Sequence, residues 1–346
     1  LYRSSDGGTS FQKMNTNNVR PFYYSQVRVD PVDPDRVYWS STPVNVSNDG
    51  GATVGQTTVG LHVDHHAMWI DPNDPERMVV GNDGGVGVTF DRGGNWLFPN
   101  TMPLGQFYEV SFGMEIPYTV CGGLQDNGSW CGPSRRQRGD ITNHMWASVG
   151  GGDGFYTLQD PVDHEIVYSE SQGGNMGRNN TATGEQMSFP KPNWKREWLR
   201  WEDSILANPD AGESELRHFR EMQAADSAKA DLRWNWNTPL VLSPHDHTVV
   251  YVAATRVVKY TNRGEDFQVI SPDLSYADPE KIRVSTETTG GITPDVTGAE
   301  TFATIVALAE SPLAQGFLLA GTDDGRAWMT RDDGANWEEL TDRFPG

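Results

Sequence analysis

One eight-residue pattern recurs along this chain, and it constrains the fold more than any other feature. The pattern is Ser/Thr-x-Asp-x-Gly-x-x-aromatic. Its clear copies are Ser4–Phe11, Thr89–Trp96 and Thr330–Trp337, and weaker copies lie at Ser47–Val54 and Tyr260–Phe267. The first three copies along the chain are about 42 residues apart, and a pattern repeated at such a period predicts an array of one supersecondary unit.

A second motif recurs in phase with the first. It is an Asp-Pro or Ser-Pro turn followed by an apolar run, at Asp30–Tyr38, Asp71–Val79, Asp160–Tyr168 and Ser243–Tyr251. Proline fixes φ and aspartate accepts local backbone hydrogen bonds, so the motif joins a first strand to a second. Glycine-rich turns then lead to a third strand, and the eight-residue pattern leads to a short fourth strand. Four strands in about 40 to 45 residues are typical of a β-propeller blade.

The two motifs together predict an all-β, seven-bladed β-propeller that occupies residues 1–346 as one domain. The expected blades are 1–14, 22–58, 62–100, 105–138, 148–190, 236–275 and 300–345. The first blade holds only two strands. Because a propeller closes its ring to protect every sheet edge, we expect the missing strands upstream of Leu1, in a longer chain.

Composition narrows the function classes. The formal net charge of -20 argues against binding to nucleic acid or anionic membranes by charge, and it suits Ca²⁺ binding. The sequence contains no apolar run of about 18 residues, so it predicts no transmembrane helix.

The two cysteines, Cys121 and Cys131, flank a turn-rich segment that should fold as a hairpin. Facing strands would bring them within disulfide reach, although two free buried thiols would also fit. A disulfide indicates an oxidising compartment, so a secreted, periplasmic or cell-surface location is expected.

Residues 191–233 break the repeat. Their apolar residues recur at spacings of three and four, which predicts a helical hairpin inserted between the fifth and sixth blades. Such an insert would either cover apolar surface on the ring, or wall a binding cleft or dock a partner.

The turns of each blade divide between two faces. The eight-residue boxes and the Asp-Pro turns lie on one face, so binding residues should lie on the other, where the loops before strand one and between strands two and three gather. The box aspartates Asp6, Asp91 and Asp332 should therefore be structural, bonding amides of their own turns.

The loops on the second face carry aspartates in four blades, and paired carboxylates are what glycoside hydrolysis needs. The candidate catalytic residues are Asp126 and Asp153, ranked first because their blades adjoin, together with Asp83 and Asp323. The alternative is that such Asp-Gly pairs only make turns. The same loops supply candidate substrate-binding residues: Gln125, Asn127, Trp130, Trp234, Trp236, Asn237 and Arg256. The tryptophans could stack on sugar rings or could pack between blades.

Asp64 and His66 alternate along a predicted strand and could face Asp83. These three residues could bind Ca²⁺ or another divalent metal, or could form a polar network without one. No other cofactor is expected.

These motifs resemble a group of bacterial secreted proteins with BNR, or Asp-box, repeats, which include sortilin-like proteins and proteins labelled glycosyl hydrolases. The stretches that carry the resemblance are His62–Pro72, Gly81–Gly85, Leu104–Tyr108, Gly122–Gly132, Gly150–Phe155, Asn235–Pro239 and Gly321–Gly325. The related two-propeller xyloglucan hydrolases use paired aspartates in the cleft between propellers, which implies a second propeller upstream. Sialidases share the Asp box, but the arginine triad that they use is not evident here.

Two hypotheses follow. The first is a carbohydrate-active hydrolase that cleaves a polysaccharide by paired carboxylates. The second is a non-catalytic propeller that binds peptide, glycan or a partner subunit, as the sortilin-like resemblance implies.

Overall fold

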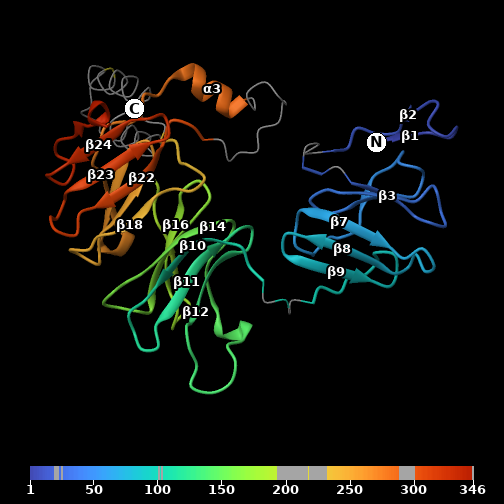
Figure 1. Ribbon diagram of the computed structural model, residues 1–346, viewed down its shortest axis with the longest axis horizontal. Helices are drawn as coiled ribbons and strands as arrows, with labels where there is room; N and C mark the ends of the chain where they lie inside the picture. The colour runs from blue at the N-terminus through green and yellow to red at the C-terminus, as the bar shows by residue number, and fades with distance from the viewer. Residues whose placement is uncertain are drawn as a thin grey trace, which may run out of the picture. The chain divides into compact units, whose positions relative to one another are not determined.

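The computed structural model describes residues 1–18, 23, 24, 26–99, 102, 104–192, 217, 232–287 and 301–344 (Figure 1). The chain forms two compact units, 1–104 and 105–346, each with its own sheets.

Unit 1 contains three antiparallel sheets within its described residues. The first pairs β1 (Tyr2–Arg3) with β2 (Gln12–Lys13). The second orders β3 (Val27–Val29), β4 (Val37–Trp39), β5 (Asn45–Ser47) and β6 (Gly55–Gln56). The third orders β7 (His65–Ile70), β8 (Met78–Asn82) and β9 (Gly85–Thr89), and Leu97 adds a single bridge to Val88.

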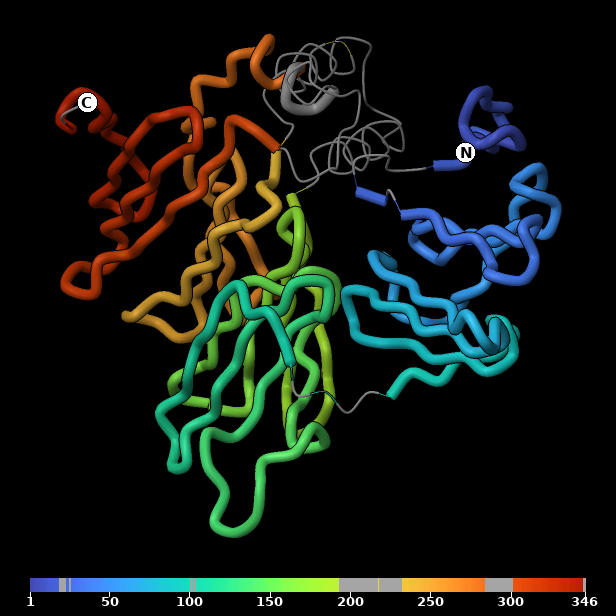
Figure 2. Tube along the Cα trace, turned by 45° about the vertical axis from the view of Figure 1, so that its right-hand side comes forward, coloured from blue at the N-terminus to red at the C-terminus, as the bar shows by residue number. Residues whose placement is uncertain are grey.

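Unit 2 contains four sheets of four strands among its described residues. They follow one another along the chain, as the change of colour from green to red shows (Figure 2). They are β10 (Phe107–Phe112), β11 (Thr119–Leu124), β12 (Gly128–Pro133) and β13 (Ala147–Gly150); β14 (Gly154–Gln159), β15 (Ile166–Ser171), β16 (Asn175–Asn180) and β17 (Gln186–Ser188); β18 (Leu240–Leu242), β19 (Val250–Ala253), β20 (Val257–Thr261) and β21 (Asp266–Val269); and β22 (Ile305–Glu310), β23 (Leu318–Thr322), β24 (Ala327–Thr330) and β25 (Glu338–Glu339).

These seven sheets confirm the predicted all-β, seven-bladed propeller class. Each complete sheet is an antiparallel meander in sequence order, as a blade requires. The first sheet has the two strands that the sequence predicted for it. The helical hairpin predicted at 191–233 lies mostly outside the described residues.

One blade boundary was wrong. The sequence ended the fourth blade at residue 138 and began the fifth at 148, but Ala147–Gly150 is the fourth strand of the fourth sheet. It pairs with β12 through Trp130 and Ser148. A long excursion precedes this strand, and it has no Asp box to mark it, so the pattern gave no signal for its position.

The Asp boxes fold through one set of hydrogen bonds. In the box at Thr89, the Thr89 hydroxyl donates to Asp91 Oδ1 and accepts the amide of Gly93, while Asp91 Oδ1 accepts the amide of Asn95 at 2.8 Å. These bonds hold the pKa of the Asp91 carboxyl at about 2, below its usual value. The Trp96 indole donates to the carbonyl of Thr57 in the preceding blade, so the box ties neighbouring blades together.

The Asp-Pro turns work in the same way at buried positions. Asp160 is fully buried, and its Oδ1 accepts the amides of Val162 and Asp163. Its Oδ2 pairs with His247 and Arg263, which lie in two turns of the next blade. Between the sheets, apolar side chains such as Tyr168, Val252 and Tyr260 form the core that joins blades five and six.

The hairpin of β11 and β12 carries the predicted disulfide. Cys121 and Cys131 are paired in register, and their sulfurs are bonded at 2.04 Å. Both residues are buried beside Val149 and Val167, where they form part of the contact between blades four and five.

The sequence did not predict α3 (Pro279–Glu287). Its start has a recognisable signature, because Asp278 Oδ1 accepts the amides of Glu280 and Lys281 and Pro279 follows at the first helical position. None of the helices in the described part of the chain has the length and apolar character needed to cross a membrane.

Four blades share an irregularity in their first strand. The pairing with the second strand shifts register between His65 and Ala67, Phe107 and Glu109, Gly154 and Thr157, and Ile305 and Ala307. A bulge of this kind re-aims the extra side chain. The bulged positions include His66 and Tyr108.

Candidate functional site

In unit 2, the turn between the second and third strands of blade four and the loop that enters blade five bring two aspartates together. Asp126 lies between β11 and β12 with φ of 57°, and Asp153 precedes β14. The amide of Asp126 donates to Asp153 Oδ1 at 2.8 Å. Both side chains are half-buried. The structure therefore brings together the two residues that the sequence ranked first.

Glycine makes this approach possible. A side chain at Gly154 would meet the carbonyl oxygen of Gly128 at 2.4 Å, so the two blades could not approach as closely with any larger residue there. A second bond between blades joins the Gly128 amide to the Gly152 carbonyl at 2.8 Å. The glycine-rich segments seen in the sequence thus serve the contact between blades four and five.

Tyr108 joins this pair, and the sequence did not single it out as a site residue. Its ring stacks on Phe155, with centroids 4.5 Å apart and planes at 18°. Burial raises the pKa of the Tyr108 phenol, and the negative charges of Asp153 and Asp126 raise it further. The phenol is therefore a proton donor at neutral pH, close to both carboxylates. Tyr108 lies at a strand bulge, and the sequence alone gave no indication of that bulge.

Gln172 links this cluster to the next blade. Its Oε1 accepts the amide of Asp153 at 2.8 Å, and the following residue, Gly173, donates to the carbonyl of Trp236 at 3.1 Å. A continuous series of hydrogen bonds thus crosses blades four to six, through Asp126, Asp153, the Gln172–Gly173 turn and Trp236. The predicted convergence of polar turns holds for this part of unit 2.

Trp234 packs at the far end of the same series. A Cβ on Gly174 would lie 2.3 Å from the Trp234 ring, so the indole covers that turn. The Lys191 ammonium lies 5.2 Å from the ring centroid and donates to the Gly173 carbonyl and to Asn175 Oδ1. Trp234 and Trp236 are both half-buried, so each keeps some ring surface in solvent.

Glu170 lies on β15, two residues before Gln172. It is only 1% exposed, and its Oε1 accepts the amides of Gly174 and Thr238. Its Oε2 is buried without a hydrogen-bond partner among the described residues. Burial raises the pKa of Glu170 to about 9, so the carboxyl is protonated at neutral pH. It joins blade five to blade six.

Asp323 is held in a different network. Its Oδ1 accepts the amide of Thr304 at 2.8 Å and its Oδ2 accepts the Thr304 hydroxyl, which in turn accepts from Asn235. Burial raises the pKa of Asp323. These bonds join blades six and seven, and no described hydrogen bond connects Asp323 to Asp126 or Asp153. Its catalytic role stays a prediction.

The other predicted binding residues of unit 2 mostly serve their own turns. The Trp130 indole donates to the Asn127 carbonyl at 2.7 Å, and the Asn127 side chain donates to the Gln125 carbonyl. Asn237 donates its amide to Asn235 Oδ1. Arg256 lies in the turn between β19 and β20.

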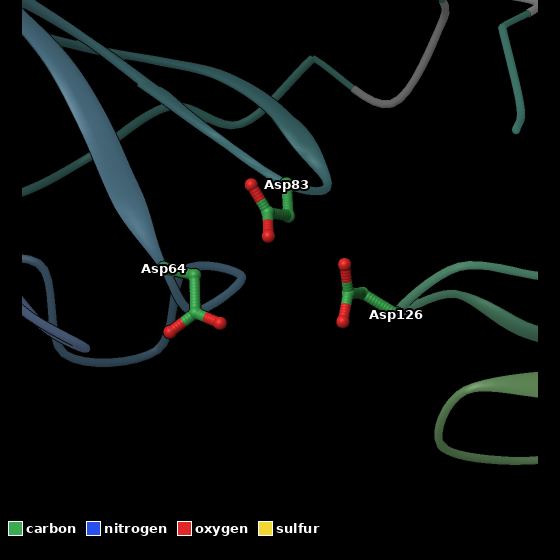
Figure 3. Close-up of side chains that lie close together, drawn as sticks. All are labelled: Asp64, Asp83 and Asp126. Atoms are coloured by element: carbon green, nitrogen blue, oxygen red, sulfur yellow. The ribbon is translucent and has the colours of Figure 1, made fainter. Parts of the chain in front are cut away.

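In unit 1, Asp83 lies close to both of its predicted metal-binding partners. One oxygen of Asp64 and one of Asp83 are within 4.8 Å of each other (Figure 3), and His66 Nε2 is 3.4 Å from Asp83 Oδ1. Tyr24 donates its hydroxyl to Asp64, and Tyr23 donates to Asp83. The Tyr23 ring also packs edge-on against His66 at 4.5 Å. Hydrogen bonds and ring contacts account for this arrangement, and its metal role stays a prediction.

Comparison with known proteins gives distant likenesses only. No protein-family model matches the chain, and no curated protein matches it. Among solved structures, the chain is similar to the GH74 xyloglucanase from Xanthomonas campestris, at 16% identity and a TM-score of 0.36, over 90% of this chain and 45% of that one. An ancestral GH74 enzyme gives 13% and 0.36, over 92% and 38%. The Niastella koreensis GH74 enzyme gives 11% and 0.29, over 92% and 38%. The chain thus spans less than half of each of these structures, and no family membership follows from such values.

Proposed function

We propose that unit 2 is carbohydrate-active and hydrolyses glycosidic bonds with Asp126 and Asp153 as its two carboxylates. The observation that carries the proposal is the 2.8 Å bond between the Asp126 amide and Asp153 Oδ1, which holds two acids from different blades side by side. The phenol of Tyr108 beside them supplies a hydrogen-bond donor.

The 2.8 Å bond limits how far apart the two carboxyl groups can lie. A carboxyl carbon lies up to roughly 4 Å from the amide nitrogen of its own residue, so the two groups are held within roughly 8 Å of each other. Retaining glycosidases hold their carboxyls about 5 to 5.5 Å apart, whereas inverting enzymes need about 6.5 to 9.5 Å to admit a water. The proposal takes the retaining geometry, the shorter of the two, because the two residues are bonded directly.

The residues take the following roles in this proposal. Asp153 Oδ1 accepts the hydrogen bond from the Asp126 amide, so Oδ2 of the same carboxylate attacks the anomeric carbon. At the same time Asp126 gives its proton to the departing glycosidic oxygen. The C–O bond to the leaving sugar breaks and a glycosyl ester on Asp153 forms. Asp126 then removes a proton from the water that cleaves this ester. Trp234 provides a ring face for a neighbouring sugar.

The test is hydrolysis of a panel of β-glucan, xyloglucan, xylan and mannan substrates by the purified full chain. Asp126→Asn and Asp153→Asn should each lower kcat by at least about a hundredfold, because each removes one half of the acid–nucleophile pair. Asp323→Asn is the matched control, and it should retain activity if its bonds to Thr304 are structural. Full activity in both of the first two variants would reject the assignment.

A binding module without catalysis is the second candidate. The observation that favours it is that Asp153 already bonds a backbone amide, as a turn-locking residue would. In that case glycan arrays or calorimetry would show binding that Trp234→Ala weakens, and no substrate would be cleaved. The disulfide is consistent with a secreted protein in either case, because such bonds persist in oxidising compartments.

A further inference from the structure

A separate polar cluster lies at the opposite end of blades four and five, among the turns between their first and second strands. Glu115 lies in the turn after β10, Gln159 ends β14, and His164 lies in the turn that follows. None of them contacts Asp126 or Asp153 in the described hydrogen bonds. The side chains of Glu115 and Gln159 converge at Gly113, the first residue after β10, and His164 lies beside Glu115.

The geometry of this cluster is tight. A Cβ built on Gly113 would lie 2.1 Å from Glu115 Oε2 and 2.3 Å from Gln159 Oε1, so these two oxygens are within a few ångströms of each other. His164 Nδ1 is 3.9 Å from Glu115 Oε2, which is too long for a hydrogen bond. A carboxylate oxygen, an amide oxygen and an imidazole nitrogen thus lie together where the first turns of blades four and five meet.

All three of these atoms are buried without a hydrogen-bond partner among the described residues: Glu115 Oε2, Gln159 Oε1 and His164 Nδ1. The other carboxylate oxygen, Oε1, accepts the Thr119 amide at 3.1 Å and the Gln159 side-chain nitrogen at 3.5 Å. The Gln159 amide is therefore oriented with its oxygen toward Gly113. Buried polar atoms normally have partners, so three unpaired atoms that lie together indicate a missing one.

The chemistry of the missing partner follows from the three atoms. Two of them are oxygens that can only accept, so the partner must be a donor or a cation. An imidazole nitrogen together with carboxylate and amide oxygens suits Mn²⁺ or Zn²⁺, which accept mixed nitrogen and oxygen ligands.

We propose that Glu115, Gln159 and His164 form a divalent-cation site that joins blades four and five. Metal–ligand distances of about 2.0 to 2.3 Å place neighbouring ligand atoms roughly 3 to 4.5 Å apart, in agreement with the 3.9 Å between Glu115 and His164. Because Glu115 belongs to blade four and the other two ligands to blade five, a bound ion would tie the blades together. The site is independent of the proposed hydrolysis.

The test is titration of the metal-free full chain with MnCl₂, followed by the loss of the free Mn²⁺ signal in electron paramagnetic resonance, with ZnCl₂ and CaCl₂ followed by calorimetry. One Mn²⁺ or Zn²⁺ per chain should bind at this site. Glu115→Gln and His164→Ala should weaken binding at least tenfold. Glu165→Gln, which removes the neighbouring exposed carboxylate, should leave binding unchanged.

Gly113→Ala provides a further variant that keeps every ligand residue, because its Cβ would lie 2.1 Å from Glu115 Oε2 and 2.3 Å from Gln159 Oε1 and would push both oxygens out of position. Its backbone φ is not in the left-handed region, so alanine brings no backbone strain. It should abolish binding while the circular dichroism spectrum stays that of the wild type. Wild-type affinity in Gly113→Ala and Glu115→Gln would overturn the proposal. Absence of binding by the wild type would also overturn it.

Discussion

Replacing Glu170 with glutamine should change how the stability of unit 2 depends on pH. The carboxyl is 1% exposed, and burial raises its pKa to about 9 from an ordinary value of 4.5. The folded protein therefore keeps a proton that the unfolded chain releases. The contribution of this group to stability is fully present below pH 4.5 and is lost as the pH rises toward 9.

The magnitude follows from linkage. Each pH unit between the two pKa values is equivalent to about 1.4 kcal/mol, so the loss between pH 5 and pH 8 is about 4 kcal/mol. Glutamine keeps an oxygen that can accept from the Gly174 and Thr238 amides, and it does not titrate. The difference in unfolding free energy between Glu170→Gln and the wild type should therefore shift by about 4 kcal/mol in favour of glutamine over this range.

The assay is urea unfolding at pH 5, 6.5 and 8, followed by tryptophan fluorescence. Glu185→Gln, an exposed acid in the next hairpin turn, serves as the matched control and should run parallel to the wild type at every pH. If Glu170→Gln also runs parallel to the wild type, within about 1 kcal/mol, then Glu170 is not protonated in the folded protein and the reasoning is refuted.

Three further predictions concern an Asp-box turn, the disulfide hairpin and a buried ion pair between blades. Thr89→Val should lower the unfolding free energy of unit 1 by about 1 to 3 kcal/mol, because the buried hydroxyl bonds both Asp91 and Gly93; an unchanged urea midpoint would contradict this. Reduction of the Cys121–Cys131 bond, which closes a short loop with a sequence separation of 10, should cost about 3 kcal/mol, measured as the shift in midpoint with and without reductant. Arg263→Met should cost about 3 to 5 kcal/mol, since it removes one partner of the fully buried Asp160; Arg343→Met, in an exposed pair, should cost less than about 1 kcal/mol in the same assay.

The sequence predicted the blade architecture well because the repeat encodes it locally. The hydrogen bonds that form the turn of an Asp box join residues no more than four positions apart, as Thr89, Asp91 and Asn95 show, so eight residues suffice to specify the turn. Even the weak copy at Ser47 makes the same bonds, with Asp49 accepting from Ser47 and from the amide of Thr53. The hairpin that pairs Cys121 with Cys131 was predictable for the same reason.

The fourth strand of blade four was not predictable, because β13 follows an excursion that carries no repeat signal. Side-chain partners between blades were also inaccessible. The bond between Asp126 and Asp153 spans 27 positions, and the contact of Glu170 with Thr238 spans 68. Such pairs depend on how far one blade is rotated from the next, which no local pattern records. The sequence placed Asp126 and Asp153 on the same face by topology, but it could not identify Tyr108 or the cluster of Glu115, Gln159 and His164.

The bulges in the first strands determine which positions of the blades can be substituted without disturbing the core. A regular strand commits alternate residues to the core, so a substitution there disturbs packing as well as chemistry. A bulged residue lies outside that alternation, and His66 and Tyr108 are both at such positions, each beside aspartates of its own unit. Positions 66 and 108 can therefore accept new side chains while the blades stay intact. A small combinatorial library at these two positions, screened first for expression and then for ligand binding, would explore new specificities at little risk to folding.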